Sequence, residues 1–543
     1  MGDGRSRAGQ SPDSNRISLS QHWPWERPTP VYTGRRCLRG LLSGLALGVL
    51  ALAGCADAPA APDPTPSAPA QPAAPAEPGA VNIVLGRPAD TSIAASVLVD
   101  PGTEVYLEFG TSPGSYPSVT STERATSGYP VVVEVGGLAP NTRYFYRARY
   151  RSATETAFRA DAERTFQTQR PAGSTFTFGV QGDSHPERPG NMFNADLYSL
   201  NMRNVASRRP DFYVALGDDF SVEPLLDRNQ LSQANVDAIY RNQRTYFGLL
   251  GHSTPVFLVN GNHEQAAAYL LNGRYPTPFG EAPLHSARAR TGYFALPAPG
   301  GFYSGDPTEL PGIGPLRDYY AWEWGDALFV TIDPYWHSPV PVDNGVPGVD
   351  KAADPWQITM GDQQYAWLER VLRTSRAKYK FVFEHHVLGT FRGAAAIVHQ
   401  YEWGGYNRNG TAYEFSAMRP GWARPIHQLM DQNGVTIFFG AHDHLFAREQ
   451  VDGVIYQSVP NPADNTYTAF NSDSYNPARV ALPGARYDPR AGVVLPNAGW
   501  LQVTVAPDQV TVAYVRAVLP GDESKTGAAN GAVAVSYTVP APR

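Results

Sequence analysis

The chain has 543 residues, which is more than one ordinary domain, and 42% of them are hydrophobic, enough for a sizeable core. Its formal net charge of -6 is spread over both signs, so the sequence has no basic stripe of the kind that a nucleic-acid backbone requires. We therefore expect two folded units with extensions and no nucleic-acid partner.

The N-terminal segment has the layout of an export signal. Three arginines between residues 35 and 39 precede an uncharged apolar stretch at 41–54, which is shorter than the roughly 20 residues of a membrane-spanning helix. The stretch ends in Leu-Ala-Gly-Cys, which resembles a bacterial lipobox, in which the cysteine becomes the lipidated first residue. We predict a leader at 1–54 and lipidation of Cys55. The protein would then be exported and lipid-anchored to a bacterial cell-envelope membrane, on its periplasmic or cell-surface side.

Alternatives to this interpretation of the leader stay open. The apolar stretch could be a short membrane anchor or a buried helix, and translation could start further along the chain. The pair Arg35-Arg36 partly matches a twin-arginine export signal. Cys37 and Cys55 are the two cysteines of the sequence, so cleavage before Cys55 would leave no second thiol for an intramolecular disulfide.

Two segments precede the catalytic part of the chain. Residues 55–79 are mostly Ala and Pro and predict a solvated, semi-rigid linker. Residues 80–170 read as short alternating strands, for example at 92–99, 104–109 and 129–135. The pattern Leu-Ala-Pro-Asn-Thr-Arg-Tyr that ends at Tyr144 resembles the tyrosine corner of fibronectin type III and related β-sandwich domains. We predict a β-sandwich whose aromatic side chains form its core.

From residue 171 to about 520 the pattern changes to continuous apolar runs alternating with helix-like stretches. Such runs are typical of strands buried on both faces, and their alternation with helices predicts an α/β layered fold. The runs lie at 176–180, 212–216, 256–259, 327–332, 380–383 and 435–439, and the helices at 195–207, 236–249 and 361–375. Residues 500–505 and 509–515 predict a hairpin that closes the sheet edge. The tail, 521–543, is expected to be loose.

Five short polar blocks each follow one of these apolar runs. They are Gly182-Asp183-Ser184-His185, Gly217-Asp218-Asp219, Gly261-Asn262-His263-Glu264, Glu384-His385-His386 and Ala441-His442-Asp443-His444. Open α/β sheets place their ligands at the carboxyl ends of strands. Carboxylate and amide oxygens mixed with imidazoles suit Zn, Mn or Fe, so the blocks together predict a site for two adjacent metal ions.

The order of the blocks resembles the calcineurin-like metallophosphoesterase superfamily, and in particular its purple-acid-phosphatase-like branch, which carries a fibronectin-like N-terminal domain. The resemblance covers roughly residues 81–515. It implies a four-layer α/β/β/α catalytic domain after the sandwich. Carried over to matching positions, it also implies that one metal is held by Asp183, His185 and His444 and the other by Asn262, His385 and His442, with Asp218 as the bridge.

The resemblance also implies the chemistry. Two cations roughly 3.5 to 4 Å apart acidify a bridging water, and the resulting metal-bound hydroxide attacks phosphorus in line. His263 would protonate the leaving oxygen or stabilise the transition state. We predict hydrolysis of small phosphate esters, with a phosphomonoesterase preferred. A phosphodiesterase remains an alternative, as does a non-catalytic surface-binding lipoprotein whose metal site is structural.

Four positions depart from the family pattern or leave a choice open. Purple acid phosphatases have a tyrosine three residues after the bridging Asp, and this chain has Ser221, so a tyrosinate-iron centre is not expected. His386 is a second candidate beside His385. Ala441 replaces a common glycine, and no loss is expected from it. Asp219 is expected to be solvated rather than a partner of the site.

The remaining histidines and the long insertion at 264–333 receive no functional role. Histidines without a motif are expected on the surface or in loops, and they are His252, His285, His337, His399 and His427. The insertion contains several Arg and Tyr residues, which are more often a solvated face than a phosphate site.

Overall fold

The computed structural model describes residues 81–542 except for 276–278, 345, 347–351, 353, 388–396 and 470–492. These residues belong to one compact unit that spans 71–543. The predicted leader, Cys55 and the whole of the predicted linker lie outside the described residues. Within the described ranges no helix combines the length and the apolar character needed to cross a lipid bilayer.

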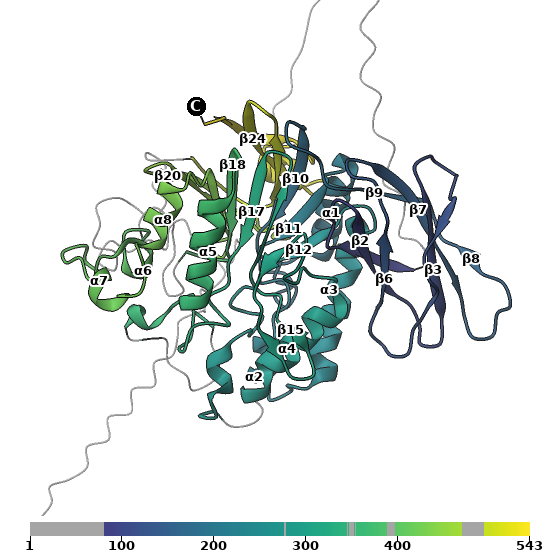
Figure 1. The fold of residues 1–543 in the computed structure, drawn as a ribbon, viewed down its shortest axis with the longest axis horizontal. Coiled ribbons are helices and arrows are strands. Elements are labelled where there is room, and N and C mark those ends of the chain that lie inside the picture. The colour runs from purple at the N-terminus through teal and green to yellow at the C-terminus, as the bar shows by residue number, and fades with distance from the viewer. Residues whose placement is uncertain are drawn as a thin grey trace, which may run out of the picture. The chain divides into compact units, whose positions relative to one another are not determined.

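The N-terminal part is a β-sandwich (Figure 1). One sheet contains β1 (Asn82–Gly86), β2 (Ser92–Leu98) and β6 (Val131–Gly136). The other is built on β3 (Glu104–Gly110) and β7 (Arg143–Arg151), with β4 (Ser118–Val119), β5 (Glu123–Arg124), β8 (Arg159–Ala160) and β9 (Arg164–Gln167) beside them. Alternate side chains of β3 and β7 enter the core, as period-two patterning requires.

The tyrosine corner is present as predicted. The backbone N–H of Ala139 donates to the hydroxyl of Tyr144 at 2.8 Å, and the Tyr144 ring stacks on Phe166 in the sandwich core. The predicted role of the aromatic side chains in the core is therefore confirmed.

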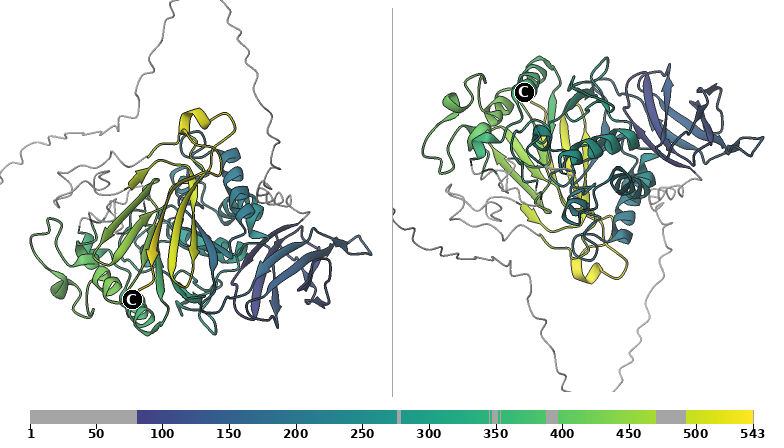
Figure 2. Two further views of the ribbon diagram at one scale, coloured as in Figure 1. Left: turned by 90° about the horizontal axis from the view of Figure 1, so that it is seen from above. Right: turned by 90° about the horizontal axis from the view of Figure 1, so that it is seen from below.

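Two larger sheets follow. The first has the order β12-β11-β10-β23-β24-β25, in which β10 (Phe176–Gln181), β11 (Phe212–Ala215) and β12 (Val256–Leu258) are parallel. Its other strands are β23 (Gly499–Val505), β24 (Gln509–Arg516) and β25 (Val533–Pro540). Figure 2 shows these three C-terminal strands, in yellow, side by side.

The second sheet has the order β13-β16-β17-β18-β19-β21-β20-β22. Its central strands β17 (Ala327–Thr331), β18 (Tyr379–Phe383), β19 (Ile437–Gly440) and β21 (Val454–Ser458) are parallel. Around them lie β13 (Ser304–Gly305), β16 (Tyr320–Trp324), β20 (Phe446–Val451) and β22 (Val493–Leu495). A separate short pair joins β14 (Glu309–Leu310) to β15 (Gly314–Pro315).

The two sheets pack face to face through aromatic side chains. Phe178 of β10 lies with its ring centroid 5.2 Å from Phe329 of β17 and 5.4 Å from Phe381 of β18. Large aromatic side chains bury much apolar area, so this inner layer is the main core of the domain.

Helices cover the outer face of each sheet, and they complete the predicted four-layer α/β/β/α arrangement. On the six-stranded sheet lie α1 (Ala195–Arg208), α3 (Gln233–Gly251) and α4 (Ala282–Tyr293). On the eight-stranded sheet lie α5 (Asp362–Thr374), α6 (Tyr401–Gly404), α7 (Phe415–Met418) and α8 (Ile426–Gln432). Short helices elsewhere are α2 (Glu223–Asp227) and α9 (Glu523–Thr526), with single 3-10 turns at Ala268–Asn272, Phe279–Glu281 and Pro355–Gln357.

Sequence signals set the helix ends. Asn194 and Ser232 accept backbone N–H groups at the N-termini of α1 and α3. In the insertion, Arg290 of α4 is buried and donates to the backbone carbonyl of Leu258 at 2.6 Å. The expectation of a solvated arginine face is therefore wrong at this residue, which ties the helix to β12.

The C-terminal prediction was wrong in one respect. The hairpin at 500–515 forms as expected, but the tail after Pro520 is not loose, because Val533–Pro540 forms β25 along β24. The hairpin therefore does not close the sheet, and β25 is the edge strand. Val533 is 51% exposed, which explains why its pattern resembles that of an unstructured tail.

The sandwich contacts α3 through buried polar groups. The fully buried guanidinium of Arg244 donates to the backbone carbonyls of Ser96 at 2.8 Å and of Tyr293. The hydroxyl of Tyr146 donates to the carbonyl of His252 at 2.6 Å. His252 lies in the loop after α3, as one of the two predicted alternatives has it, but its side chain is buried in this junction.

His252 makes stability sensitive to acid. Burial, helped by nearby Arg164, lowers the pKa of His252 to about 4. Its pKa in the unfolded chain is about 6.5, so between these values the unfolded state binds more protons and stability falls as the pH falls. The free energy of unfolding of the wild type should fall between pH 7.5 and pH 4, and His252 should account for as much as about 3 kcal/mol of this loss. We expect His252→Gln to lack that contribution. Urea unfolding at both pH values measures this, and equal acid sensitivity in the two proteins would contradict it.

Candidate metal centre

The five polar blocks meet at one edge of the molecule. They follow β10, β11, β12, β18 and β19, whose carboxyl ends point the same way within each parallel set. The seven predicted ligands in these blocks are buried, with exposures of 5% or less. Several turn sharply after the strand with positive φ, namely His185, Asp218, His442 and His444. Backbone strain of this kind is typical of functional sites.

One group of ligands contains Asp183, His185 and His444. The Nε2 atoms of His185 and His444 are 3.0 Å apart, and Asp183 Oδ1 lies 3.5 Å from His444 Nε2 and 4.0 Å from His185 Nε2. All three donor atoms therefore point at a common place, as the sequence predicted for the first metal.

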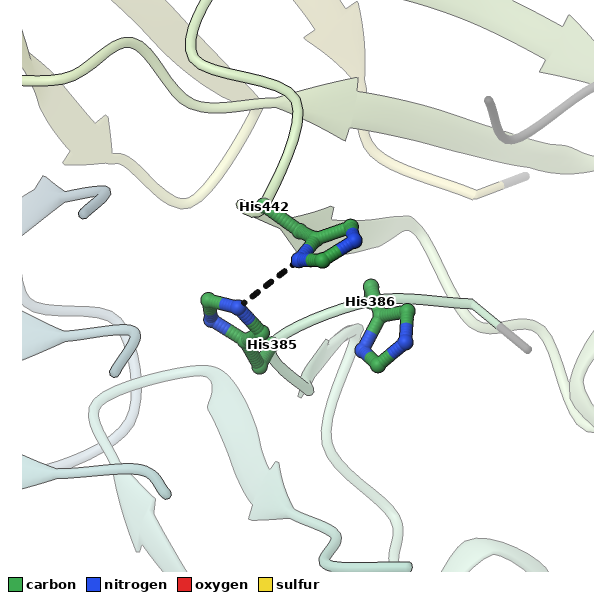
Figure 3. Close-up of side chains that lie close together, drawn as sticks. All are labelled: His385, His386 and His442. Atoms are coloured by element: carbon green, nitrogen blue, oxygen red, sulfur yellow. Dashed lines mark hydrogen bonds between the residues drawn. The ribbon is translucent and has the colours of Figure 1, made fainter. Parts of the chain in front are cut away.

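A second group contains Asn262, His385 and His442. His385 Nε2 lies 3.1 Å from Asn262 Oδ1 and 3.2 Å from His442 Nδ1, a contact drawn in Figure 3. Asp218 lies between the groups, because its Oδ2 is 3.2 Å from His385 Nε2 and 3.6 Å from His185 Nε2. The structure thus brings together all seven residues predicted as ligands, with Asp218 in the place of a bridge.

The outward nitrogens of three ligand histidines are fixed by oxygen acceptors. His185 Nδ1 is 2.8 Å from Glu187 Oε1, and His385 Nδ1 is 2.8 Å from the carbonyl of Leu216. His442 Nε2 is 3.2 Å from Asp343 Oδ2. Such partners select the tautomer that leaves the inward nitrogen free to bind a cation.

The donor set fits two transition-metal or zinc ions. Four imidazole nitrogens, two carboxylates and one amide oxygen converge on the same region. Without a cation between them, the nitrogens of neighbouring histidines would face each other. Although burial raises the pKa of Asp183, His444 and His385 lower it to about 2. The pKa of Asp218 also lies well below its usual range. Burial raises this pKa, but His385 and His263 lower it by more. Both carboxylates are therefore charged and ready to bind cations.

His385 and His386 differ in the side chains that they face. His385 faces Asn262 and Asp218, whereas the His386 ring stacks on His442 at 4.2 Å between centroids (Figure 3). The Nδ1 atom of His386 is 2.8 Å from the hydroxyl of Tyr335. His386 therefore lies beside the second group, and donor atoms of His385, His386 and His442 lie within 4.8 Å of one another.

His263 lies beside the ligands, with Nε2 toward Asp218 and Nδ1 toward Glu223. Its Nδ1 is 2.6 Å from Glu223 Oε2, and its Nε2 is 3.9 Å from Asp218 Oδ2. Burial lowers the pKa of His263, but Asp218 and Glu223 raise it to about 9. Arg188 Nη2 is 3.4 Å from His263 Nε2. The imidazole is thus held as a proton donor next to a second cation.

Two buried carboxylates support the loops without joining the donor set. Glu264 accepts backbone N–H groups of Asp218 at 3.0 Å and Gly261 at 2.7 Å, so it ties together two of the blocks. Asp219 is 1% exposed and accepts from Gln181 and Ser184. The expectation that Asp219 is solvated is wrong, because its neighbours enclose it completely.

Three residues of the site had not been singled out from the sequence. Glu187 could have been noticed, since it lies two residues after His185, just beyond the first block. Glu223 at the start of α2 and Asp343 in the loop after β17 carry no local signal, because only the fold brings them to His263 and His442.

Comparisons with known proteins agree with this geometry. The family of calcineurin-like phosphoesterases matches residues 176–446. The structure of PhoD is similar, with a TM-score of 0.57 at 15% identity over 85% of this chain and 90% of that one. A purple acid phosphatase, PPD1 from yellow lupin (Lupinus luteus) seeds, has a TM-score of 0.53 at 15% identity over 85% of this chain and 74% of that one. No curated protein matches the sequence.

The family match covers the segment that carries all five polar blocks, and the likeness to the two solved structures shows the same fold. Residues 176–446 therefore form a domain of the calcineurin-like phosphoesterase family, and the chain is a metal-dependent phosphoesterase.

Proposed function

We propose that this protein is a dinuclear phosphomonoesterase, lipid-anchored through Cys55 on the outer side of a bacterial cell-envelope membrane. The observation that carries the catalytic part is the convergence of seven donor side chains on two neighbouring places, with Asp218 between them. Asp183, His185 and His444 would hold one cation, and Asn262, His385 and His442 the other. Zn, Mn and Fe all fit these donors.

When bound, two such cations polarise the phosphoryl oxygens of the substrate and lower the pKa of a coordinated water. The residues of the chain supply orientation and proton transfer. His263 Nε2 faces the ligand groups, and Glu223 holds its Nδ1, so His263 donates a proton to the leaving oxygen from Nε2. Ser221, at the position where a purple acid phosphatase has tyrosine, supplies no phenolate to a metal.

Arg188 favours a phosphomonoester over a diester. Its side chain is 37% exposed, and Nη2 lies 3.4 Å from His263 Nε2. A monoester carries up to two negative charges on its phosphoryl group, and a guanidinium binds such oxygens well. The name of the lupin protein, a phosphatase, supports the same preference.

The substrate class is tested with two generic esters. We expect p-nitrophenyl phosphate to be hydrolysed with a higher kcat/KM than bis-p-nitrophenyl phosphate in protein loaded with Zn, Mn or Fe. Arg188→Met should reduce this preference, because it removes the cation without shortening the side chain. A preference for the diester that Arg188→Met leaves unchanged would overturn the assignment as a monoesterase.

The role of Glu223 gives a separate prediction. Glu223→Gln removes the charge that orients His263, and we expect kcat to fall by about 10-fold. Metal content should not change, because the Glu223 carboxylate contacts His263, which is not one of the predicted ligands. Asp227→Asn, an exposed change at the other end of α2, serves as the control. Equal kcat for Glu223→Gln and the control would rule out the positioning role.

The anchor is tested on full-length protein in bacterial cells. Cys55→Ser should move the protein from the membrane to the soluble fraction, because the serine cannot be lipidated. Cys37→Ser lies within the predicted leader and should leave membrane association unchanged. A Cys55→Ser protein that remains in the membrane fraction would contradict lipid anchoring.

A further inference from the structure

A second cluster of possible metal ligands lies outside the candidate metal centre. It contains Asp306 after β13, Asp318 before β16 and His337 after β17. One donor atom from each side chain lies within 4.8 Å of the others. None of the three residues belongs to the predicted donor set, so this cluster needs its own explanation.

Burial makes the cluster costly without a cation. Asp306 is 0% exposed and Asp318 is 1% exposed. His337 Nε2 is 2.7 Å from Asp318 Oδ2, and even a protonated His337 balances only one of the two carboxylate charges. A buried charge that lacks a partner is strongly unfavourable, so the cluster requires either a further cation or a shared proton.

The hydrogen bonds leave two carboxylate oxygens available. Asp306 Oδ1 accepts from the backbone N–H of Thr308 at 2.9 Å and from Gln363 Nε2 at 3.3 Å. The other oxygen of Asp306, Oδ2, and Asp318 Oδ1 are buried and have no well-oriented hydrogen-bond donor among the residues that the structure describes, although the two carboxyl groups and the Tyr319 hydroxyl lie close together. Besides the proximity of the three side chains, these two oxygens are the evidence for a bound cation.

Electrostatics agree with a shortage of positive charge. Burial raises the pKa of Asp318 although His337 opposes it, and the Asp306 carboxylate adds to the rise. The pKa of His337 is raised by Asp318 in spite of burial. Each group thus responds to an excess of negative charge, which a divalent ion would remove.

We propose that Asp306, Asp318 and His337 form a third metal site, which takes Zn²⁺ or Mn²⁺. Two carboxylates with one imidazole suit these ions, whereas Mg²⁺ and Ca²⁺ prefer oxygen donors alone. The His337 side chain is 15% exposed, so water can reach the site and complete the coordination.

An ion in this site would stabilise the segment that follows β17. His337 lies in that segment, together with Asp333 and Tyr335. Asp333 Oδ2 accepts from Asn260 Nδ2 at 2.6 Å, and the hydroxyl of Tyr335 is 2.8 Å from His386 Nδ1. The third site would therefore support one side of the catalytic centre while supplying none of its ligands.

The test is metal content measured by mass spectrometry. Full-length chain is stripped with a chelator, equilibrated with Zn²⁺ or Mn²⁺ and desalted. We expect three equivalents in the wild type and two in His337→Gln and in the double variant Asp306→Asn, Asp318→Asn. Asp326→Asn should keep three, because this buried carboxylate pairs with Lys378 instead.

A second background separates this site from the proposed catalytic centre. In a protein with Asp183→Asn and His385→Ala, the third site should still bind one equivalent, and adding His337→Gln should remove it. The wild type and His337→Gln could instead bind the same amount of metal, no more than two equivalents per chain. In that case the third site does not exist, and the cluster holds a shared proton. That result would leave the catalytic proposal intact.

Discussion

Asp218→Asn is expected to lower phosphoesterase activity by more than about 10³-fold and to reduce the metal content of the catalytic centre. Asp218 Oδ2 lies within 3.6 Å of ligand nitrogens from both groups, so one carboxylate serves two cations. Asparagine keeps the shape but loses the charge that makes a shared ligand possible. Metal analysis and turnover of p-nitrophenyl phosphate measure the two effects.

The neighbouring residue provides a matched control for this change. Asp219 is equally buried, but it accepts from Gln181 and Ser184, and burial raises its pKa well above the usual range. Asparagine therefore resembles the neutral form of Asp219, and Asp219→Asn should retain both catalytic metals. An Asp218→Asn protein with the same metal content as Asp219→Asn would refute the bridging role.

His263→Asn is expected to cut turnover by about 10²- to 10⁴-fold, the range of a lost general acid, while the metals stay bound. The imidazole is held by Glu223 on one side and faces the ligand groups on the other. The loss should be smaller for p-nitrophenyl phosphate than for an alkyl phosphate, because a good leaving group needs less protonation. Steady-state kinetics with both esters measure the difference.

His427→Asn is a suitable comparison for the His263 variant. His427 is also buried, but its ring nitrogens contact Tyr456 and Asp452, which are not among the predicted ligands. We expect this change to leave the ratio of the two ester rates unaltered. Unchanged turnover in His263→Asn would remove the acid role of His263.

Local sequence patterns predicted most of the fold. Apolar runs such as Phe176–Gln181 are buried on both faces, and helices such as Ala195–Arg208 begin at a capping residue. Both signals depend on near neighbours, so a single sequence contains them. The edge strand Val533–Pro540 was missed because its composition does not indicate a strand. It is ordered by its pairing with β24, which the sequence pattern does not reveal.

The candidate site could be predicted only in part for a similar reason. The ligands follow strands in short blocks, and these blocks are visible in the sequence. Glu223 and Asp343 contact His263 and His442 only after distant segments meet. Three histidines that were expected on the surface or in loops have largely buried side chains, namely His252, His337 and His427. Their neighbours come from distant parts of the chain, so the local sequence does not reveal the burial.

The family match makes a purely structural metal site an unfavourable explanation, because the blocks lie within a phosphoesterase domain. The structure adds His263, which a structural site would not require. The two findings together favour catalysis over the surface-binding alternative.

The most direct test of this account is phosphate-ester hydrolysis by purified protein before chelation, after chelation and after reconstitution with Zn, Mn or Fe. We predict that chelation abolishes hydrolysis of p-nitrophenyl phosphate and that at least one of the three metals restores it. The absence of hydrolysis of both monoester and diester substrates with every one of the three metals would contradict the account.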